Sequence, residues 1–260
     1  MTVDNSIPAS DNRLLAALPS EDYRRISQSL IGRPVFGREI LQRRDEPIRE
    51  IYFPGRSLCS LILTTSDGAM AEVAVVGAEG FVGVEAALGI SQAISDGTVQ
   101  VAGDRMLQAM DISAFRQEFD RRGAFHSYVM EYVQRFIGFT MQSVACNGLH
   151  SADARCCRWL LHAQDRLASN DLPITHDLLS TMLAVRRPTV TLIVGELVQA
   201  GIISNGRGRI RIEDRAGLEA RSCECYTTVK KLFSQAPKRG RWQLNMHDEQ
   251  RWSEAAAHIP

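Results

Sequence analysis

The hydrophobic positions of this chain change their period near residue 112. From Arg33 to about Ile112 the apolar runs are short and rich in β-branched residues, and turn residues such as Asp67-Gly68 separate them. Several short strands at a spacing of roughly 8–12 residues are typical of an all-β barrel or jelly roll. An Asp-Gly pair suits a tight turn, so a hairpin is expected around residues 67–68.

After residue 113 the apolar positions recur at helical spacing. A long helix is expected over residues 125–149, and a second helix over about residues 152–167. In the long helix, steps of three and four residues alternate, which is the pattern of a coiled-coil seam. The seam positions are Val129, Tyr132, Phe136, Phe139 and Ser143. This pattern predicts a dimerisation helix, and a helix packed on its own domain would have the same period.

Two further helices and a basic hairpin are predicted between residues 172 and 212. Thr175 can cap the first helix, and the second is expected from Arg187 to Gln199, with Gly201 as its stop. The segment NGRGRIRI follows, and its alternation of Ile with Arg is typical of a strand with one exposed face. Two helices joined by a tight turn and followed by a basic hairpin form a winged helix-turn-helix.

The candidate DNA-binding residues lie at the start of the second helix and in the hairpin. In a helix-turn-helix the second helix enters the major groove N-terminus first, where an arginine can bond to guanine O6 and N7. Thr175 and the hairpin arginines are expected at phosphates, which fix register without reading sequence. The predicted set is Thr175, Arg186, Arg187, Thr189, Thr191, Arg207 and Arg209. A helical hairpin with solvated arginines is the alternative, and the order of the elements favours DNA binding.

Composition and charge narrow the choice of partner. The chain has 260 residues, enough for two ordinary domains, and 45% of them are hydrophobic. Its 30 basic and 30 acidic side chains cancel, which excludes a polybasic protein but not a local DNA-binding patch. Residues 172–212 hold five arginines against Asp177 and Glu196, a difference of +3. No apolar run reaches the roughly 18 residues of a membrane span, so a cytoplasmic protein without a membrane partner is expected.

Residues 13–226 resemble the Crp/Fnr family of transcription regulators. The segment ITHDLLSTMLAVRRPTVTLIVGELVQAGIIS is similar to the helix-turn-helix of that family, YFPGRSLCSLILTTSDGAMAEVAVVGAEGFVGVEAALG resembles its β-roll sensor domain, and RAGLEARSCECY resembles a tail found in one branch. The resemblance implies a homodimer on a palindromic operator in double-stranded DNA, with RNA polymerase as a further partner. It implies an α+β chain with four parts: a cyclic-nucleotide-binding-like β-roll (jelly roll) at residues 13–122, a dimerisation helix at 123–150, a winged helix-turn-helix at 151–226 and a C-terminal extension at 227–260.

The chain departs from the family pattern at its base-reading positions. Arg187 matches the family's base-reading arginine at the start of the recognition helix. The glutamate that usually follows is Pro188 here, and a second usual arginine is Leu192. The resemblance therefore predicts an operator whose sequence differs from the one usual in the family.

The sensor domain departs from the family pattern as well. Family members that bind cyclic AMP hold its phosphate with a Gly-Glu segment and a following Arg-Ser or Arg-Thr. Gly83, Glu85 and Ser95 match parts of that pattern and are the expected effector site, but the arginine is missing. Because arginine is the bidentate partner of phosphate, cyclic AMP is not expected to bind tightly. The effector is left open, and no cofactor is expected. Oxygen-sensing members of the family hold an iron–sulfur cluster on cysteines near the N-terminus, but the first cysteine here is Cys59, so that site is missing.

The cysteines are expected to be buried structural thiols rather than metal ligands. Cys146 and His150 lie four residues apart, but a metal site needs three or four convergent ligands. Cys223 and Cys225 are two residues apart, and such positions on a helix do not face each other. No metal site is therefore predicted.

No pattern of catalytic residues stands out, so the chain is not expected to be an enzyme. It has no GxSxG, no Walker loop and no GxGxxG after a strand. Two alternatives to an effector-controlled DNA regulator remain open. One is a ligand-binding signalling module that acts on a protein partner. The other is a regulator whose β-roll has lost ligand binding and only supports the dimer.

Overall fold

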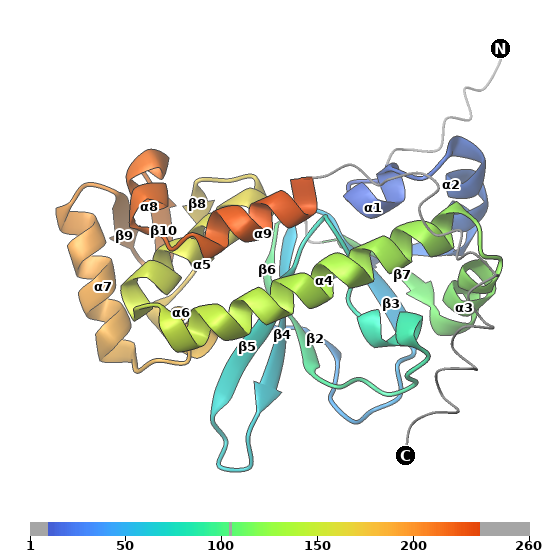
Figure 1. Cartoon of the computed structure of the whole chain (residues 1–260), viewed down its shortest axis with the longest axis horizontal. Helices are drawn as coiled ribbons and strands as arrows, with labels where there is room; N and C mark the ends of the chain where they lie inside the picture. The colour runs from blue at the N-terminus through green and yellow to red at the C-terminus, as the bar shows by residue number, and fades with distance from the viewer. Residues whose placement is uncertain (1–9, 104–105, 235–260) are drawn as a thin grey trace, which may run out of the picture.

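A computed structural model describes residues 10–103 and 106–234 of the chain (Figure 1). It has the predicted α+β fold, in which a β-roll is followed by a long helix and a helical domain with a small sheet. Residues 235–260 of the predicted C-terminal extension lie outside the described residues.

Two antiparallel sheets form the β-roll. In their order within the sheets, the strands are β1 (Leu30–Pro34), β7 (Met106–Asp111) and β3 (Glu50–Pro54), then β2 (Ile40–Gln42), β6 (Asp96–Ala102), β4 (Ser57–Thr64) and β5 (Met70–Val76). Alternate residues of β6 are buried, as expected for a strand with one face on the core. The predicted hairpin is confirmed: its turn joins β4 to β5, and Gly68 has the left-handed φ of 84° that favours glycine.

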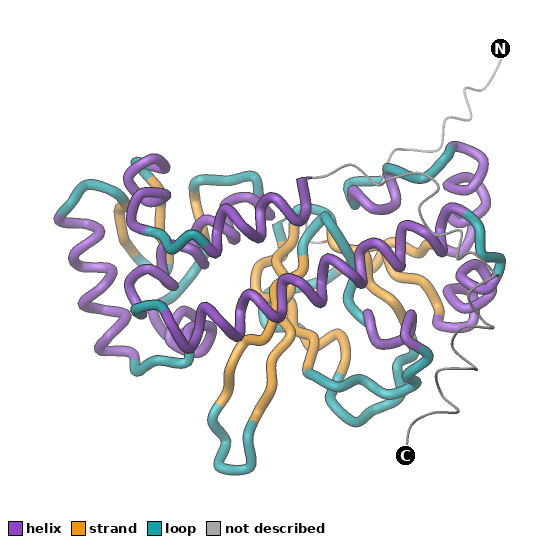
Figure 2. The backbone as a smooth tube through the Cα atoms, in the orientation of Figure 1, coloured by secondary structure: helices purple, strands orange, loops and turns teal. Residues whose placement is uncertain are grey.

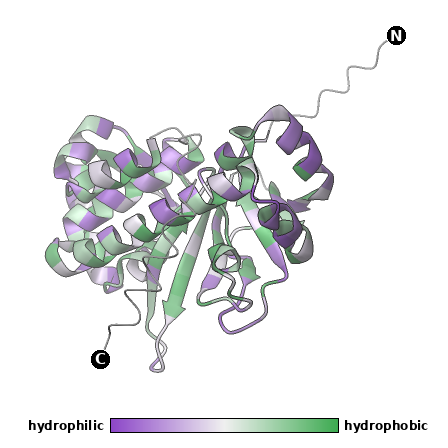
Figure 3. Ribbon diagram, turned by 45° about the vertical axis from the view of Figure 1, so that its right-hand side comes forward, coloured by the Kyte–Doolittle hydropathy of each residue, from purple (hydrophilic) through white to green (hydrophobic). Residues whose placement is uncertain are grey.

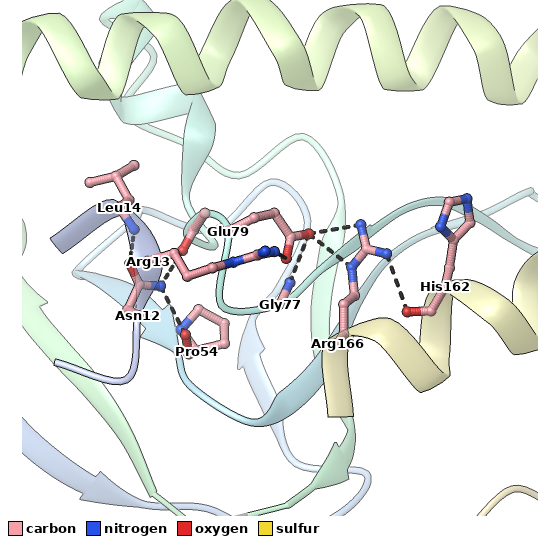
Figure 4. A network of polar contacts seen from close by, with 9 residues as sticks. Asn12, Arg13, Leu14, Pro54, Gly77, Glu79, His162 and Arg166 are labelled. Atoms are coloured by element: carbon pink, nitrogen blue, oxygen red, sulfur yellow. Dashed lines mark hydrogen bonds and ion pairs between the residues drawn. The ribbon is translucent and has the colours of Figure 1, made fainter. Parts of the chain in front are cut away.

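Short helices close the ends of the β-roll. They are α1 (Arg13–Ala16), α2 (Ser20–Ile26), η1 (Ser27–Ser29), η2 (Val84–Leu88) and α3 (Ile112–Asp120). Asn12 caps α1, and its buried side-chain amide donates to the backbone oxygens of Pro54 and Gly80 (Figure 4). Asn12, just before the predicted domain start at residue 13, therefore belongs to the β-roll. Figure 3 shows hydrophilic residues dominating the N-terminal helices, whereas hydrophobic residues follow the strands.

The predicted long helix is confirmed as α4 (Ala124–Leu149), but its seam faces the wrong way for a dimer contact. Val129, Tyr132, Phe139 and Ser143 are buried within the chain itself, and Phe136 is half-buried. Tyr132 lies with its ring centroid 5.0 Å from that of Phe81 in the β-roll. The interpretation of these positions as the dimer seam is therefore wrong: they pack α4 onto its own chain. Figure 2 shows α4 crossing the strands, with the last helix, α9, beside it.

The C-terminal domain consists of five helices and a three-stranded sheet among the described residues. The helices are α5 (Ala152–Leu167), α6 (His176–Leu183), α7 (Arg187–Gln199), α8 (Arg215–Arg221) and α9 (Cys225–Ser234), and the strands are β8 (Asp171–Leu172), β10 (Arg209–Ile212) and β9 (Ile203–Gly206). The second predicted helix matches α5, and the predicted recognition helix matches α7. Strand β8 was not predicted, because two residues are too few to produce a recognisable alternation.

The two predicted domains share a continuous hydrophobic core, which includes residues of β4, β5, α5, α6 and α7. Two polar contacts cross the same boundary. Glu79, after β5, forms an ion pair with Arg166 of α5 at 2.7 Å, and each side chain is 6% exposed (Figure 4). Glu72 of β5 accepts a hydrogen bond from the Trp159 indole at 2.8 Å, and burial raises the pKa of this carboxyl to about 7. The β-roll therefore contacts the helical domain directly.

Within the described ranges, no single helix has the length and apolar character needed to cross a membrane. Only α6 and α7 taken together pass that test, as a pair bent by 111°.

Candidate nucleic-acid interface

Helix α6 begins at a side-chain cap, as predicted. Thr175 is the N-cap, and its Oγ1 accepts a hydrogen bond from the backbone N–H of Leu178 at 3.1 Å. Leu179, Met182 and Leu183 bury the inner face of the helix. The helix ends at Ala184, whose φ of 50° turns the chain sharply toward α7. This hydrogen bond fixes the start of α6, where Thr175 lies beside the wing.

Helix α7 presents an exposed face along its whole length. Its inner residues, Val190, Ile193, Val194 and Leu197, are buried. The exposed residues of its first half are Arg187, Pro188, Thr191 and Leu192, and Gly195, Glu196, Val198 and Gln199 are exposed further along the helix. Pro188 lies in the first turn, where the missing N–H has no helical acceptor to lose. Leu192 is 69% exposed, which is unusual for a large apolar side chain and leaves it free to meet a partner.

The hairpin of β9 and β10 forms the wing. Its turn residues, Arg207 and Gly208, both have left-handed φ angles, 44° and 78°, which is the combination of a type I′ turn. Ile210 is buried while Arg209 is exposed, so the predicted alternation along β10 is confirmed. The turn lies against α6: a Cβ on Gly208 would be 3.5 Å from the methyl group of Thr175.

A chain of hydrogen bonds joins the wing, α6 and α7. Asn205 Nδ2 donates to His176 Nε2 at 3.1 Å, and His176 Nδ1 lies 3.1 Å from Thr191 Oγ1, which donates to the backbone oxygen of Arg187. An imidazole that accepts at Nε2 and donates at Nδ1 satisfies the whole chain while it is neutral. His176 and Asn205 were not predicted, because each has its partner on an element distant in sequence.

The arginines of this surface differ in their partners. Arg187 Nε forms an exposed ion pair with Asp177 at 3.1 Å, and Arg211 pairs with Asp171 at 2.6 Å. Among the described residues, no carboxylate lies within 4.0 Å of the charged groups of Arg186, Arg207 or Arg209. The last three arginines are exposed, so their charge is available to an anionic partner.

The predicted effector residues come together in the β-roll. Gly83 has a left-handed φ of 100° and precedes η2, which carries the buried Glu85. Glu85 Oε1 accepts hydrogen bonds from Gln42 Nε2 at 3.4 Å and from the backbone N–H of Ile94 at 3.2 Å. Glu85 Oε2, Gln42 Oε1 and Ser95 Oγ are buried and have no hydrogen-bond partner among the described residues. Gln42 was missed, since nothing in its local sequence marks it.

The structure contradicts one argument about the cysteines. Cys223 lies before α9 rather than on a helix with Cys225, so the rule for helical positions two apart does not apply. The ligand atoms of Cys146, His150, Cys223 and Cys225 lie within 4.8 Å of one another. The expectation that these thiols do not converge is therefore wrong, whereas their predicted burial is confirmed.

Comparisons with known proteins agree with this geometry. Residues 154–221 match the model of the Crp-like helix-turn-helix domain. A Crp/Fnr-family regulator from Eubacterium rectale aligns with a TM-score of 0.62 and 18% identity, over 81% of this chain and 98% of its own. TTHB099, a CRP-family regulator from Thermus thermophilus, gives 0.60 and 19% over 73% and 96%, and FixK2 from Bradyrhizobium japonicum gives 0.60 and 17% over 75% and 98%. No curated protein matches the chain significantly in sequence.

The helix-turn-helix, its wing and the matched domain model define a DNA-binding transcription regulator. The β-roll and the long helix share the fold of solved regulators of the Crp/Fnr family.

Proposed function

We propose that the protein binds a two-fold symmetric operator as a homodimer, with one α7 in the major groove of each half-site. The observation that carries this proposal is the exposed basic edge formed by the start of α7 and the wing. Arg186 and Arg187 open the helix, and Arg207 and Arg209 project from the hairpin that contacts the start of α6. Half-sites read by a symmetric dimer lie about one helical turn, roughly 34–36 Å, apart.

The dimer contact is assigned to the outward stripe of α4. Gln134, Ile137, Met141, Val144 and Gly148 are exposed and follow steps of three, four, three and four residues. Ile137, Met141 and Val144 are 47%, 68% and 70% exposed. An apolar stripe at this spacing is the surface with which one helix packs against its symmetry mate. It replaces the seam predicted from the sequence, which lies on the opposite, buried side.

Within a half-site, Arg187 is assigned to a guanine and Leu192 to a thymine methyl group. Arginine is the commonest specific partner of guanine, and apolar side chains contact the methyl group of thymine. Thr189 and Thr191 lie near the same end of α7. Phosphate contacts are assigned to Thr175, Arg186, Arg207 and Arg209. Asp177 contacts Arg187 at Nε, which leaves the two terminal guanidinium nitrogens free to face a base.

Arg187→Ala and Arg209→Ala are expected to weaken DNA binding in different ways. Arg187→Ala should lose a bidentate base contact, which costs about 1–3 kcal/mol and relaxes specificity at that base pair. Arg209→Ala should lose a phosphate contact, which weakens binding to all sequences similarly and lowers the salt slope by about one per contact. The measurement is a salt titration of binding to a site selected from random duplexes and to its single-base variants.

Arg215→Ala is the matched control for this experiment, because Arg215 is bound to Asp165 of α5 and Glu219 of α8 and does not belong to the proposed interface. It should change neither the base preference nor the salt slope. If Arg187→Ala kept its base preference while Arg209→Ala altered it, the roles of reader and anchor would be reversed. Failure of the unmodified chain to select any sequence would contradict the proposed function.

The effector is proposed to bind near Gly83, Glu85 and Ser95, where three buried polar atoms lack partners. Buried polar groups are normally hydrogen-bonded, so these atoms mark a place where a polar ligand or ordered water would be stabilised. Ser95 is followed by Asp96, whose carboxylate accepts from the backbone N–H of Arg44. A carboxylate at this position repels a phosphate instead of neutralising it.

Calorimetry with cyclic AMP is therefore expected to give a dissociation constant weaker than about 1 μM, a binding free energy less favourable than roughly −8 kcal/mol. Ile94→Arg, which places the arginine of the Arg-Ser pattern directly before Ser95, should tighten the binding. Ile31→Arg, the same substitution at another exposed isoleucine of the β-roll, should not. Sub-micromolar binding by the unmodified protein would contradict this prediction.

As a regulator of transcription, the protein is further proposed to act in the cytoplasm and to contact RNA polymerase. Both proposals rest on the class of protein and on its DNA partner. A test is whether polymerase recruitment to a promoter carrying the selected operator depends on the protein.

A further inference from the structure

Four side chains that commonly bind metals converge where the long helix meets the last helix. Cys146 and His150 lie one turn apart at the end of α4, Cys223 lies in the segment before α9, and Cys225 is the first residue of α9. Their ligand atoms, three sulfurs and one imidazole nitrogen, lie within 4.8 Å of one another. The cysteines are buried and the histidine is partly buried, and none of the four belongs to the DNA interface or the β-roll site.

Two of the six distances between ligand atoms fit a single tetrahedral ion. Cys146 Sγ lies 3.5 Å from Cys223 Sγ, and Cys225 Sγ lies 3.5 Å from His150 Nδ1. Ligands bound at about 2.3 Å for sulfur and about 2.0 Å for nitrogen are themselves about 3.5–3.8 Å apart around tetrahedral zinc. These two pairs therefore already have the spacing of ligands that share one ion. Four protein ligands fill the tetrahedral shell, which is typical of a structural zinc site rather than a catalytic one.

The surrounding polar groups orient the ligands. His150 Nε2 lies 3.2 Å from Glu224 Oε1, which leaves Nδ1 to face the three sulfurs. A carboxylate on the outer nitrogen of a metal-binding histidine fixes its tautomer and ring orientation. Gln142 Nε2 donates to Cys225 Sγ at 3.0 Å, a contact that favours a thiolate over a thiol.

Charge balance points in the same direction. Arg158 is 7% exposed, and its Nε has no hydrogen-bond partner among the described residues. The positive charge of Arg158 acts on Cys146 and Cys223 of the cluster, and also on Glu72 of β5. A buried cation is unfavourable without nearby negative charge. Three thiolates around Zn²⁺ carry a net charge of −1, which would offset Arg158.

We propose that Cys146, His150, Cys223 and Cys225 bind one Zn²⁺ ion per chain in a structural Cys₃His site. On binding, three thiols release their protons to solvent, four metal–ligand bonds form, and neither zinc nor sulfur changes its oxidation state. The ion joins the end of α4 to the start of α9. It thereby closes the loop of residues 146–225, which contains the whole helix-turn-helix, and fixes the DNA-binding domain to the helix that carries the dimer face.

Metal analysis of the unmodified full-length chain tests the site directly. After exposure to excess Zn²⁺ and exchange into metal-free buffer, one zinc per chain is expected, and its removal by a strong chelator should lower the melting temperature. Co²⁺ in its place should give the intense visible bands of tetrahedral cobalt with thiolate-to-metal charge transfer. A zinc content below roughly half an ion per chain would show that the site is not stoichiometric and would overturn the proposal. A cobalt spectrum typical of six oxygen ligands would overturn it as well.

Variants identify the ligands. Cys223→Ser with Cys225→Ser should lose the zinc, whereas Cys59→Ser with Cys156→Ser, a matched pair of buried cysteines outside the cluster, should keep it. Glu224→Ala alters a 74% exposed side chain, so the fold should persist while zinc affinity falls about 10- to 100-fold.

Zinc retained by the Cys223 and Cys225 double variant would overturn the assignment. So would a Cys146–Cys223 disulfide, without zinc, in freshly purified protein, since those two sulfurs are also close enough to be oxidised with little movement. These measurements follow metal content rather than DNA binding, so their failure would leave the proposed function untouched.

Discussion

A chain carrying Ile137→Asp and Met141→Asp is expected to be monomeric and to bind its operator about 10²- to 10⁴-fold more weakly than the unmodified protein. Both residues lie on the outward stripe of α4 and are 47% and 68% exposed. In a two-fold dimer the new carboxylates would be buried near their symmetry mates, where unpaired charge is strongly unfavourable. A monomer contacts a single half-site and loses the gain from engaging both. Sedimentation and fluorescence anisotropy measure the two effects.

The matched control introduces the same charges elsewhere. Ile31 and Phe36 are each 67% exposed on the β-roll, and Ile31→Asp with Phe36→Asp should leave the dimer and its DNA affinity intact. Phe139→Asp should instead unfold the chain, because Phe139 is 2% exposed inside its own core. Two results together would contradict this assignment: a folded monomer from Phe139→Asp and a dimer from the double variant at 137 and 141. They would show that the dimer interface is the inward stripe of α4.

Arg166→Ala is expected to lower the free energy of unfolding by about 3–5 kcal/mol, because it leaves the buried carboxylate of Glu79 without its charged partner. Arg166 donates to Glu79 Oε1 at 2.8 Å from Nε, and Gly77 donates its backbone N–H to the same oxygen at 3.2 Å. Arg13 reaches Glu79 Oε2 at 3.5 Å, but its side chain is 65% exposed. A largely solvated arginine cannot replace a buried one. Chemical denaturation at neutral pH measures the loss.

Two further variants separate the effect of burial from the loss of an arginine. Arg211→Ala removes an ion pair with Asp171 whose two side chains are about half exposed, and it should cost no more than about 1 kcal/mol. Glu79→Leu combined with Arg166→Leu removes both buried charges and should be less destabilising than Arg166→Ala alone. Equal losses of the free energy of unfolding in Arg166→Ala and Arg211→Ala would show that the buried ion pair stabilises the chain no more than the exposed one.

Much of the fold could be predicted from the sequence because its signals are local. The turn at Asp67-Gly68, the cap at Thr175 and the start of α7 at Arg187 each depend on residues within a few positions of one another. Helical and strand periods depend only on backbone geometry, so the order of sheet, long helix and winged domain followed from them. The arginines of the proposed DNA interface were found for the same reason, since the start of a recognition helix and the tip of a hairpin are defined along the chain.

The orientation of α4 could not be predicted in this way. Steps of three and four residues connect Tyr132 with Phe139, and the same steps connect Ile137 with Met141. The helical period therefore does not distinguish between the two stripes. The β-roll and α9 pack against the first stripe and leave the second exposed. Only the folded chain could therefore decide which stripe is available to a partner.

Contacts between distant segments were decided in the same way. The sequence determined that Cys146 and His150 share a helix face and that Cys223 and Cys225 are close neighbours, but the two pairs are more than 70 residues apart. The tertiary structure brings them together because α9 returns to pack on the end of α4, and it likewise joins Glu79 to Arg166 across the domain boundary. Local propensity determines the type and order of the elements, whereas the burial of apolar surface between them determines which faces meet and which polar groups share a site.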